Sequence, residues 1–394
     1  MEKIIIELIR AELCEANYTQ QGACGGIDMS DTAMLEGVYS LASRHDLAHT
    51  AGASLMKMGL SKDNPVFGLF RKARIAAVTR YEQLNCELSN LCGFLSGLKI
   101  DFIPLKGSAI RKYYPYPEMR TSCDIDILVH PDDLEKVSDA LAENLGYTKI
   151  KEGSHDVQFI SPSGINLELH FTLIEAASYP QMQTVLSRVW DYAVPDDEAG
   201  YRKILTPEFE YFYHISHMVK HFEYGGCGIR TLMDLWIYNH RSREIDRDEL
   251  AAMLDEAGIG EFEKNVRLLS EIWFSGEQPE DDRIPLYSAM QEFIFTGGIY
   301  GNVGNRVKLE RLEKESKAKY LVSRLILPYD RLKYDYPILK KHKVLMPFCE
   351  VHRWFRLLSK DTARRAVNEV KLNNGITEEG QAEMLEMLRS LGLR

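Results

Sequence analysis

The chain has 394 residues, 45% of them hydrophobic and 27% charged, and its formal net charge is −10. That length predicts two or three globular domains, and the acidic balance disfavours a nucleic-acid partner, whose binding depends on neutralising phosphates. No apolar run approaches the 18 or so residues that a membrane-spanning helix needs, so none is predicted. Seven scattered cysteines without a CxxC pair favour reduced thiols and a cytoplasmic location.

Residues 1–97 are predicted to form a helical N-terminal region. Apolar residues recur at helical spacing near the start of the chain and again from Pro65 to Gly97. Asp31 stands where a helix N-cap accepts free backbone N–H groups. His45 and His49 are interpreted as core or surface histidines rather than metal ligands.

Residues 98–200 are predicted to form a small α+β domain with a mixed β-sheet. Strand patterns alternate with helical ones, and a Ser-Pro-Ser-Gly turn joins the last two strands into a hairpin. The expected elements are a strand at 100–105, a helix at 109–114, a strand at 124–129, a helix at 131–145, strands at 156–160 and 165–171, and a plain connection at 178–205.

Residues 201–394 are predicted to form a helical C-terminal region. Thr206 is expected to cap its first helix, with Pro207 in the first turn. The glycine-rich stretch 296–305 predicts a loop or a tight helix junction. In residues 336–355 aromatic and basic residues interleave, and packing into a helical layer is favoured over a membrane-surface or partner helix.

Two motifs in the α+β domain carry chemistry. At Lys106-Gly107-Ser108, glycine lets backbone approach phosphate oxygens closely, and the lysine adds positive charge. Asp124 and Asp126 alternate with apolar residues, so on a strand both carboxylates point to one face, where a divalent cation would offset their repulsion. Each motif alone is weak, because a Gly-Ser pair arises by chance and an aspartate often serves a cap or a turn.

A third acidic residue follows on the second strand of the hairpin. Glu168 and His170 share one face of this strand, while Leu167 and Leu169 take the other. If the strand lies beside Asp124 and Asp126, the three carboxylates converge. The alternative is an edge-strand glutamate that faces solvent.

This order of motifs resembles the nucleotidyltransferase superfamily of DNA polymerase β. The words LKGSAIRKYYPYPEMRTSCDIDILV and LELHF, with the later Lys220-His221, Gly228-Ile229-Arg230 and Asp234, resemble a family of uncharacterised bacterial nucleotidyltransferases. The interval from Ser108 to Asp124 is longer than that superfamily's usual one, which predicts an extra loop, Tyr113–Pro117, over the site.

The resemblance implies a catalytic domain at 98–200 that transfers NMP from an NTP to a hydroxyl acceptor by a two-metal mechanism. The cation would be Mg²⁺ or Mn²⁺, and the acceptor an unidentified small molecule, saccharide or protein. The implied catalytic and metal-binding residues are Asp124, Asp126 and Glu168; those implied to bind nucleotide are Lys106, Gly107, Ser108 and Arg120.

Further polar residues are expected to line a substrate cleft. His214, His217 and His221 lie on one face of a predicted helix, but no other protein ligand has metal-site spacing, so a cleft-lining role is favoured over zinc. Arg230 and Asp234, four residues apart, are interpreted as an ion pair or a substrate contact. The expected cleft residues are His170, His217, His221, Arg230 and Asp234.

A second hypothesis comes from a different class of protein. The same fold can serve as a catalytically idle nucleotide-binding or antitoxin-like regulatory module. The presence of all three carboxylates favours the enzyme, because binding alone needs fewer of them.

Overall fold

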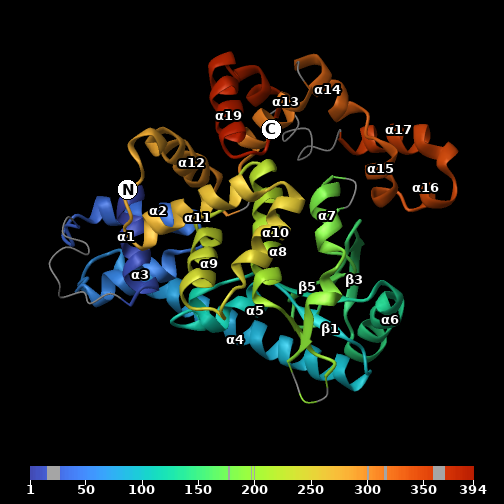
Figure 1. Ribbon diagram of the computed structural model, residues 1–394, viewed down its shortest axis with the longest axis horizontal. Helices are drawn as coiled ribbons and strands as arrows, with labels where there is room; N and C mark the ends of the chain where they lie inside the picture. Colours follow the sequence, from blue (N-terminus) through green and yellow to red (C-terminus); the bar gives the residue numbers. More distant parts are fainter. Residues whose placement is uncertain are drawn as a thin grey trace.

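The computed structural model describes residues 1–15, 27–175, 178–196, 198, 200–299, 301–314, 317–357 and 369–394. A five-stranded sheet lies between two helices on one side, α4 (Phe67–Gly97) and α6 (Leu134–Leu145), and a large helical body on the other (Figure 1). The chain is therefore α+β, with a small mixed sheet flanked by helical regions, as its sequence predicts.

The N-terminal region is helical, as expected. Asp31 Oδ1 accepts the Met34 N–H at 2.9 Å and so caps the second helix. His45 and His49 are buried, and Nε2 of each contacts a backbone carbonyl oxygen, which confirms a core role. The helices are α1 (Glu2–Leu13), α2 (Thr32–Arg44), α3 (Ala48–Lys57) and α4 (Phe67–Gly97).

The sheet has the order β1-β2-β5-β4-β3. β2 and β5 pair in parallel, and the other neighbours pair antiparallel, so the predicted β4–β5 hairpin is confirmed. Its strands are β1 (Phe102–Pro104), β2 (Asp124–Val129), β3 (Thr148–Glu152), β4 (Asp156–Ile160) and β5 (Asn166–His170). Between them lie α5 (Gly107–Ile110), the 3₁₀ turns η1 (Arg111–Tyr113), η2 (Pro117–Met119) and η3 (Pro131–Asp133), and α6 (Leu134–Leu145).

Three local expectations about this region are wrong. The helix after the Gly-Ser turn begins at Gly107 and soon tightens to 3₁₀, because Pro115 forces Tyr114 into an extended conformation. β3 was not expected, since all five of its residues are exposed and show no apolar alternation. The connection at 178–205 holds α7 (Pro180–Leu186), η4 (Val189–Tyr192), β6 (Ala193–Pro195) and β7 (Lys203–Leu205), strands too short to leave a pattern.

The C-terminal region is helical, and the glycine-rich stretch 296–305 separates two of its helices as expected. Thr206 is the N-cap residue of α8, with Pro207 in the first turn, as expected, but its buried hydroxyl makes no capping hydrogen bond. The helices are α8 (Pro207–Glu223), α9 (Ile229–His240), α10 (Arg247–Ala257), α11 (Gly260–Phe274), η5 (Asp281–Arg283), α12 (Ile284–Gly297), α13 (Val303–Lys314), α14 (Lys317–Leu325), α15 (Tyr329–Asp335), α16 (Ile338–Lys341), η6 (Lys343–Leu345), α17 (Met346–Leu357) and α19 (Glu378–Ser390).

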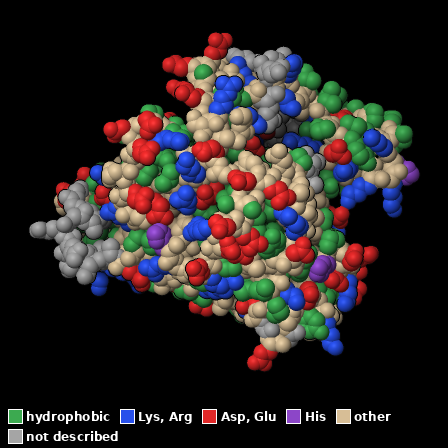
Figure 2. Space-filling view, in the orientation of Figure 1, with side chains coloured by type: hydrophobic (Ala, Val, Ile, Leu, Met, Phe, Trp, Pro, Cys, Tyr) green, Lys and Arg blue, Asp and Glu red, His purple; other side chains and the backbone are tan. Residues whose placement is uncertain are grey.

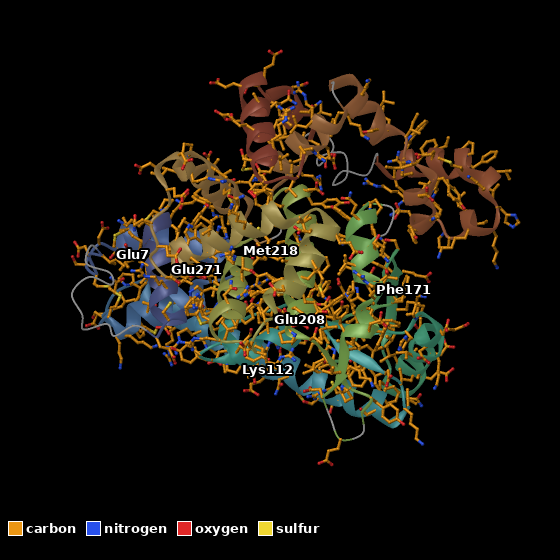
Figure 3. All side chains as sticks on the ribbon, in the orientation of Figure 1. Glu7, Lys112, Phe171, Glu208, Met218 and Glu271 are labelled. Carbon is orange, nitrogen blue, oxygen red and sulfur yellow. The ribbon has the colours of Figure 1, made fainter. Side chains whose placement is uncertain are left out.

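Two main cores hold these layers together. The larger joins α1–α3 to α8–α12, with Met218 fully buried near its middle (Figure 3). The other packs α4 and α6 against the apolar face of the sheet. The helices before and after the sheet therefore share one core, and the sheet's opposite face is turned toward that helical body.

Helices α15–α17 have a small core of their own, made of Leu332, Leu339 and Cys349. The expected packing of this aromatic segment is confirmed in part, because Tyr336, Leu345 and Met346 pack against this core. It is wrong for Phe348 and Phe355, which are 73% and 69% exposed. Figure 2 shows apolar side chains on the surface of this part of the molecule. In the part of the chain that the structure describes, no helix combines the length and apolarity needed to cross a membrane.

Candidate functional site

The candidate site lies on the polar face of the two parallel strands. In β2, Ile125 and Ile127 point into the core formed with α4 and α6, and in β5 Leu167 and Leu169 do the same. Because successive side chains on a strand alternate between faces, the acidic residues and His170 must point the other way.

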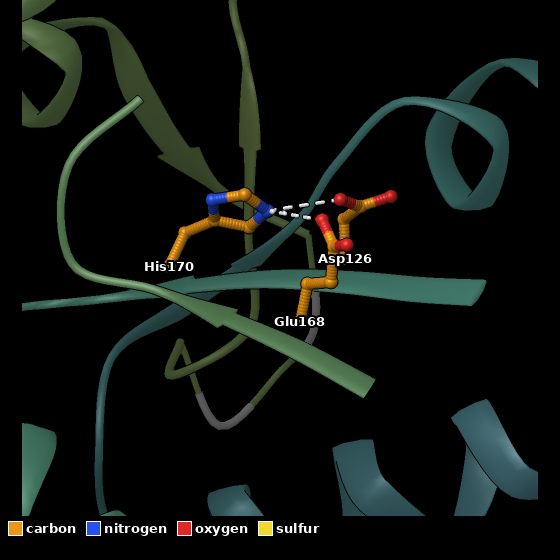
Figure 4. A group of neighbouring side chains, drawn as sticks. All are labelled: Asp126, Glu168 and His170. Atoms are coloured by element: carbon orange, nitrogen blue, oxygen red, sulfur yellow. Dashed lines mark hydrogen bonds and ion pairs between the residues drawn. The ribbon is translucent and has the colours of Figure 1, made fainter. Parts of the chain in front are cut away.

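Register then brings the key groups together. Asp126 lies directly opposite Glu168, and His170 follows two residues later on the same face of β5. Among the described residues, ligand atoms of Asp126, Glu168 and His170 all lie within 4.8 Å of one another (Figure 4). The expected convergence of these two carboxylates is therefore present.

A lysine ammonium also lies in this cluster. Lys106 Nζ is 2.5 Å from Asp126 Oδ1 and 3.9 Å from Glu168 Oε2. Burial disfavours both charged forms, but their mutual attraction prevails: it lowers the pKa of Asp126 far below its usual range and raises that of Lys106. The Asp126 carboxylate is thereby held ionised, in the form that a metal cation binds.

Asp124, two residues before Asp126 on β2, lines the same cleft but does not belong to the group of Asp126, Glu168 and His170. Burial raises its pKa, and the negative charge of Asp126 adds to that shift. Because its pKa is raised, Asp124 binds a proton more readily than an ordinary aspartate, and a cation bound here would relieve the repulsion between the two aspartates.

The Gly-Ser turn sits beside two buried guanidinium groups. A Cβ on Gly107 would lie 3.4 Å from Arg111 Nη2 and 3.6 Å from Arg120 Nη1. Burial, reinforced by Arg120, lowers the pKa of Arg111 to about 10. Sequence reasoning overlooked Arg111, although its place four residues after Gly107 puts it one helical turn from the glycine.

Ser108 is the one predicted site residue that does not line the cleft. Its backbone N–H donates to the Leu105 carbonyl at 3.1 Å, which closes the turn itself. The cleft brings together the other predicted residues, and its volume is about 350 Å³. These residues are Lys106, Gly107, Arg120, Asp124, Asp126, Glu168, His170, His217, His221, Arg230 and Asp234.

Asp234 pairs with Arg120 rather than with Arg230. Arg120 Nε lies 2.6 Å from Asp234 Oδ1, and the Tyr114 hydroxyl donates to the same oxygen at 2.6 Å. Arg230 instead contacts Asp46 at 3.3 Å and donates to the Thr121 carbonyl at 2.9 Å.

The segment Tyr113–Pro117 does not cover the cleft, contrary to expectation, and none of its residues lines it. Its tyrosines turn inward instead. The Tyr114 side chain is buried at the Arg120–Asp234 pair, and the Tyr116 hydroxyl donates to Glu12 of α1 at 2.5 Å.

The far wall of the cleft carries histidines that burial keeps neutral. His217 and His221 are 3.2 Å apart at their Nε2 atoms, and burial, reinforced by nearby lysines, lowers the pKa of His221 to about 4. His214 contacts the Thr231 carbonyl, and none of the three belongs to a metal-binding group among the described residues. The cleft-lining interpretation of this helix face is favoured over zinc.

Other cleft residues carry weak sequence signals. His155 lies 3.5 Å from the Lys220 ammonium, and burial lowers the pKa of both groups. The buried Tyr213 hydroxyl has no hydrogen-bond partner among the described residues and lines the same cleft. Tyr213 and Lys220 can be inferred from the sequence, because helical spacing puts them near the cleft-lining histidines of α8. No sequence pattern points to His155.

Comparison with known proteins agrees with this geometry. A family profile described as "Uncharacterised nucleotidyltransferase" matches residues 32–275, which include every element of the sheet and the cleft-lining helices α8 and α9. No curated protein and no solved structure matches the chain. The match spans well over half of the sequence, and the chain belongs to this family of uncharacterised nucleotidyltransferases.

Proposed function

We propose that the protein uses a divalent metal to transfer NMP from an NTP to a hydroxyl acceptor. The observation that carries this proposal is the pairing of Asp126 with Glu168 across two parallel strands, beside Lys106 and a glycine turn. The cluster places carboxylates for a cation next to positive charge for phosphates, in one cleft.

The residues present fit a divalent cation. Asp126 and Glu168 offer converging oxygens, and Asp124 adds a third carboxylate on the same face of β2. Oxygen donors of this kind suit Mg²⁺ and Mn²⁺. When bound, such a cation offsets phosphate charge and makes an acceptor hydroxyl easier to deprotonate.

The phosphate side of the cleft is basic. We assign the β- and γ-phosphates to the turn at Gly107, with charge supplied by Lys106, Arg120 and Arg230. Gly107 allows close approach, since no Cβ stands between its backbone and a ligand. The guanidinium of Arg120 is held by Asp234, so it contributes from a fixed position.

The reaction balances as an in-line displacement. The acceptor oxygen forms a bond to the α-phosphorus, and the bond from that phosphorus to the oxygen bridging to the β-phosphate breaks. Glu168, which is 28% exposed and so reachable from the cleft, accepts the hydroxyl proton. Pyrophosphate leaves with the electron pair of the broken bond.

The acceptor would enter along the wall of α8 and α9. His217, His221, Arg230 and Asp234 supply polar contacts there, with His170 near the metal ligands. A small molecule, a saccharide or a protein side chain fits this role, and the net charge of −10 disfavours a nucleic acid.

The test is label transfer from α-³²P-labelled ATP, GTP, CTP and UTP, each incubated with the full-length protein, Mg²⁺ or Mn²⁺, and a fractionated metabolite extract. The wild type should produce a labelled species and pyrophosphate. Asp126→Asn and Glu168→Gln should lower the rate by on the order of 10²–10³-fold, as loss of a charge-stabilising group does.

Glu152→Gln is the matched control, because Glu152 lies on the same sheet but is exposed on β3, outside the cleft. Equal transfer by wild type, Asp126→Asn and Glu168→Gln would contradict the assignment of these carboxylates. Tight NTP binding without label transfer, under every condition, would favour the idle nucleotide-binding module.

A further inference from the structure

The imidazole of His170 lies in direct contact with the carboxylates of Asp126 and Glu168. Its Nε2 is 2.9 Å from Asp126 Oδ1 and 3.6 Å from Glu168 Oε2, and the side chain is 2% exposed. Figure 4 shows the ring directed at both acidic groups, which come from two different strands. A nitrogen donor therefore completes the group of potential ligand atoms.

Other buried histidines of the protein are held differently. His45, His49 and His214 each place Nε2 against a backbone carbonyl, the usual way to satisfy a core imidazole. His170 places Nε2 against acidic oxygens, and its Nδ1 has no hydrogen-bond partner among the described residues. Its ring is thus fixed by the acidic cluster rather than by the surrounding backbone.

We propose that His170 is a direct metal ligand together with Asp126 and Glu168, and that the site consequently prefers Mn²⁺ to Mg²⁺. This inference rests on the proposed function, because the same cation would hold the NTP. It goes further by assigning a nitrogen ligand and a metal preference to the centre.

The preference follows from the chemistry of the donors. Mg²⁺ is a hard cation that favours oxygen ligands and gives up its water reluctantly. Imidazole suits transition metals, whereas carboxylate suits Mg²⁺ and Mn²⁺ alike. Two carboxylates with one imidazole suit Mn²⁺, which accepts both donor types.

The direct test is pulsed electron paramagnetic resonance on the full-length protein with substoichiometric Mn²⁺ and no nucleotide. A coordinated imidazole should give electron spin-echo modulation from a directly bound nitrogen. His170→Ala should abolish that signal, and His155→Ala should keep it. His155 is the matched control, because its ring lies 5.8 Å from that of His170 but outside the ligand group.

The second measurement is the ratio of the Kd values for Mg²⁺ and Mn²⁺, obtained by competition. The wild type should favour Mn²⁺, and His170→Ala and His170→Asn should reduce that preference by about tenfold or more, mainly through weaker Mn²⁺ binding. Thermal unfolding identifies variants that fail to fold, and the wild-type nitrogen signal needs no variant.

Mn²⁺ bound without nitrogen coupling in the wild type would overturn the proposal, leaving His170 to position Asp126. An unchanged metal preference in both His170 variants would also overturn it. Neither result depends on turnover. If nitrogen-ligated Mn²⁺ were found but no label were transferred, the proposed function would fail while this assignment stood.

Discussion

The backbone at Lys106 is unusual for a residue with a side chain. Its φ is +51° and its ψ is −123°, a combination that glycine tolerates and other residues avoid. The side chain at this strained position delivers the ammonium that contacts Asp126. Strain retained at a site is typical of positions where the side chain has a functional role.

We therefore expect Lys106→Gly and Lys106→Ala to separate stability from activity. Both variants lose the ammonium, so both should transfer label far more slowly than the wild type. Lys106→Gly should nevertheless be more stable than Lys106→Ala by about 1 kcal/mol, because glycine relieves the backbone strain. Urea unfolding measures the difference.

As a control, the same two substitutions at Lys136 should give the reverse order of stability. Lys136 lies exposed within α6, where glycine should be the less stable substitution by about 1 kcal/mol relative to alanine. If Lys106→Ala proved as stable as Lys106→Gly, or more stable, the backbone at residue 106 would carry no strain that glycine relieves.

At the scale of single residues, alternation made much of the site predictable. The polar face of Asp124, Asp126, Glu168 and His170 follows from period two on a strand, whatever the rest of the fold. Arg111 carries a local signal, because it lies one helical turn after Gly107, whereas the nearness of His155 to the cleft depends on how the residues before a strand pack in three dimensions. The ion pair of Asp234 with Arg120, instead of the expected Arg230, also depends on packing, because a pair between segments distant in sequence leaves no spacing pattern.

At the scale of elements, α9 is tied to the loop before β2 by a buried ion pair. Asp234 and Arg120 are nearly fully buried, and Tyr114 adds a hydrogen bond to the same carboxylate. Burial would raise the pKa of Asp234, but Arg120 lowers it, so the carboxylate stays ionised. The pair fixes α9 beside the strand that carries Asp126.

Asp234→Asn should therefore lower the free energy of unfolding by about 3–5 kcal/mol, because it leaves the Arg120 charge buried without its partner. Urea unfolding at pH 7 provides the measurement. Arg188→Ala breaks the exposed pair with Glu256 and should cost less than about 1 kcal/mol. Equal losses in the two variants would show that burial does not make the Asp234 pair special.

Elements differ in how much of them the sequence predicted. The long helix α4, the helix α6 with its Gly146 stop, and the β4–β5 hairpin carry strong periodic or turn signals and were found. β3, β6 and β7 were not, because β3 is exposed throughout and the other two have three residues each. Such strands form because neighbouring elements offer backbone partners, which no local pattern reveals.

At the scale of the whole molecule, buried histidines make folding sensitive to acid. Burial lowers the pKa of six described histidines, and for His45 it lowers the pKa to about 4. The six are His45, His49, His155, His214, His217 and His221. The pKa of His170 shifts in the opposite direction. Burial would lower it, but hydrogen bonds to Asp126 and Glu168 raise it.

The sign of the effect on stability follows from proton uptake. In the unfolded chain a histidine binds its proton near pH 6.5, whereas His45 in the folded protein does so only near pH 4. Between these values the unfolded state holds more protons, so the free energy of unfolding falls as the pH falls. Each uncompensated histidine contributes a slope of up to about 1.4 kcal/mol per pH unit.

His45→Gln isolates one of these contributions, because glutamine can still donate to the Phe295 carbonyl that His45 Nε2 contacts. Urea unfolding at pH 7, 6 and 5 should show the wild type losing stability faster than His45→Gln. The gap between them should change by about 1–2 kcal/mol in favour of the variant from pH 7 to pH 5. His342→Gln, at an exposed site, should follow the wild type. Parallel stability curves for wild type and His45→Gln would mean that His45 takes up its proton equally in both states, and that the acid sensitivity of the fold arises elsewhere.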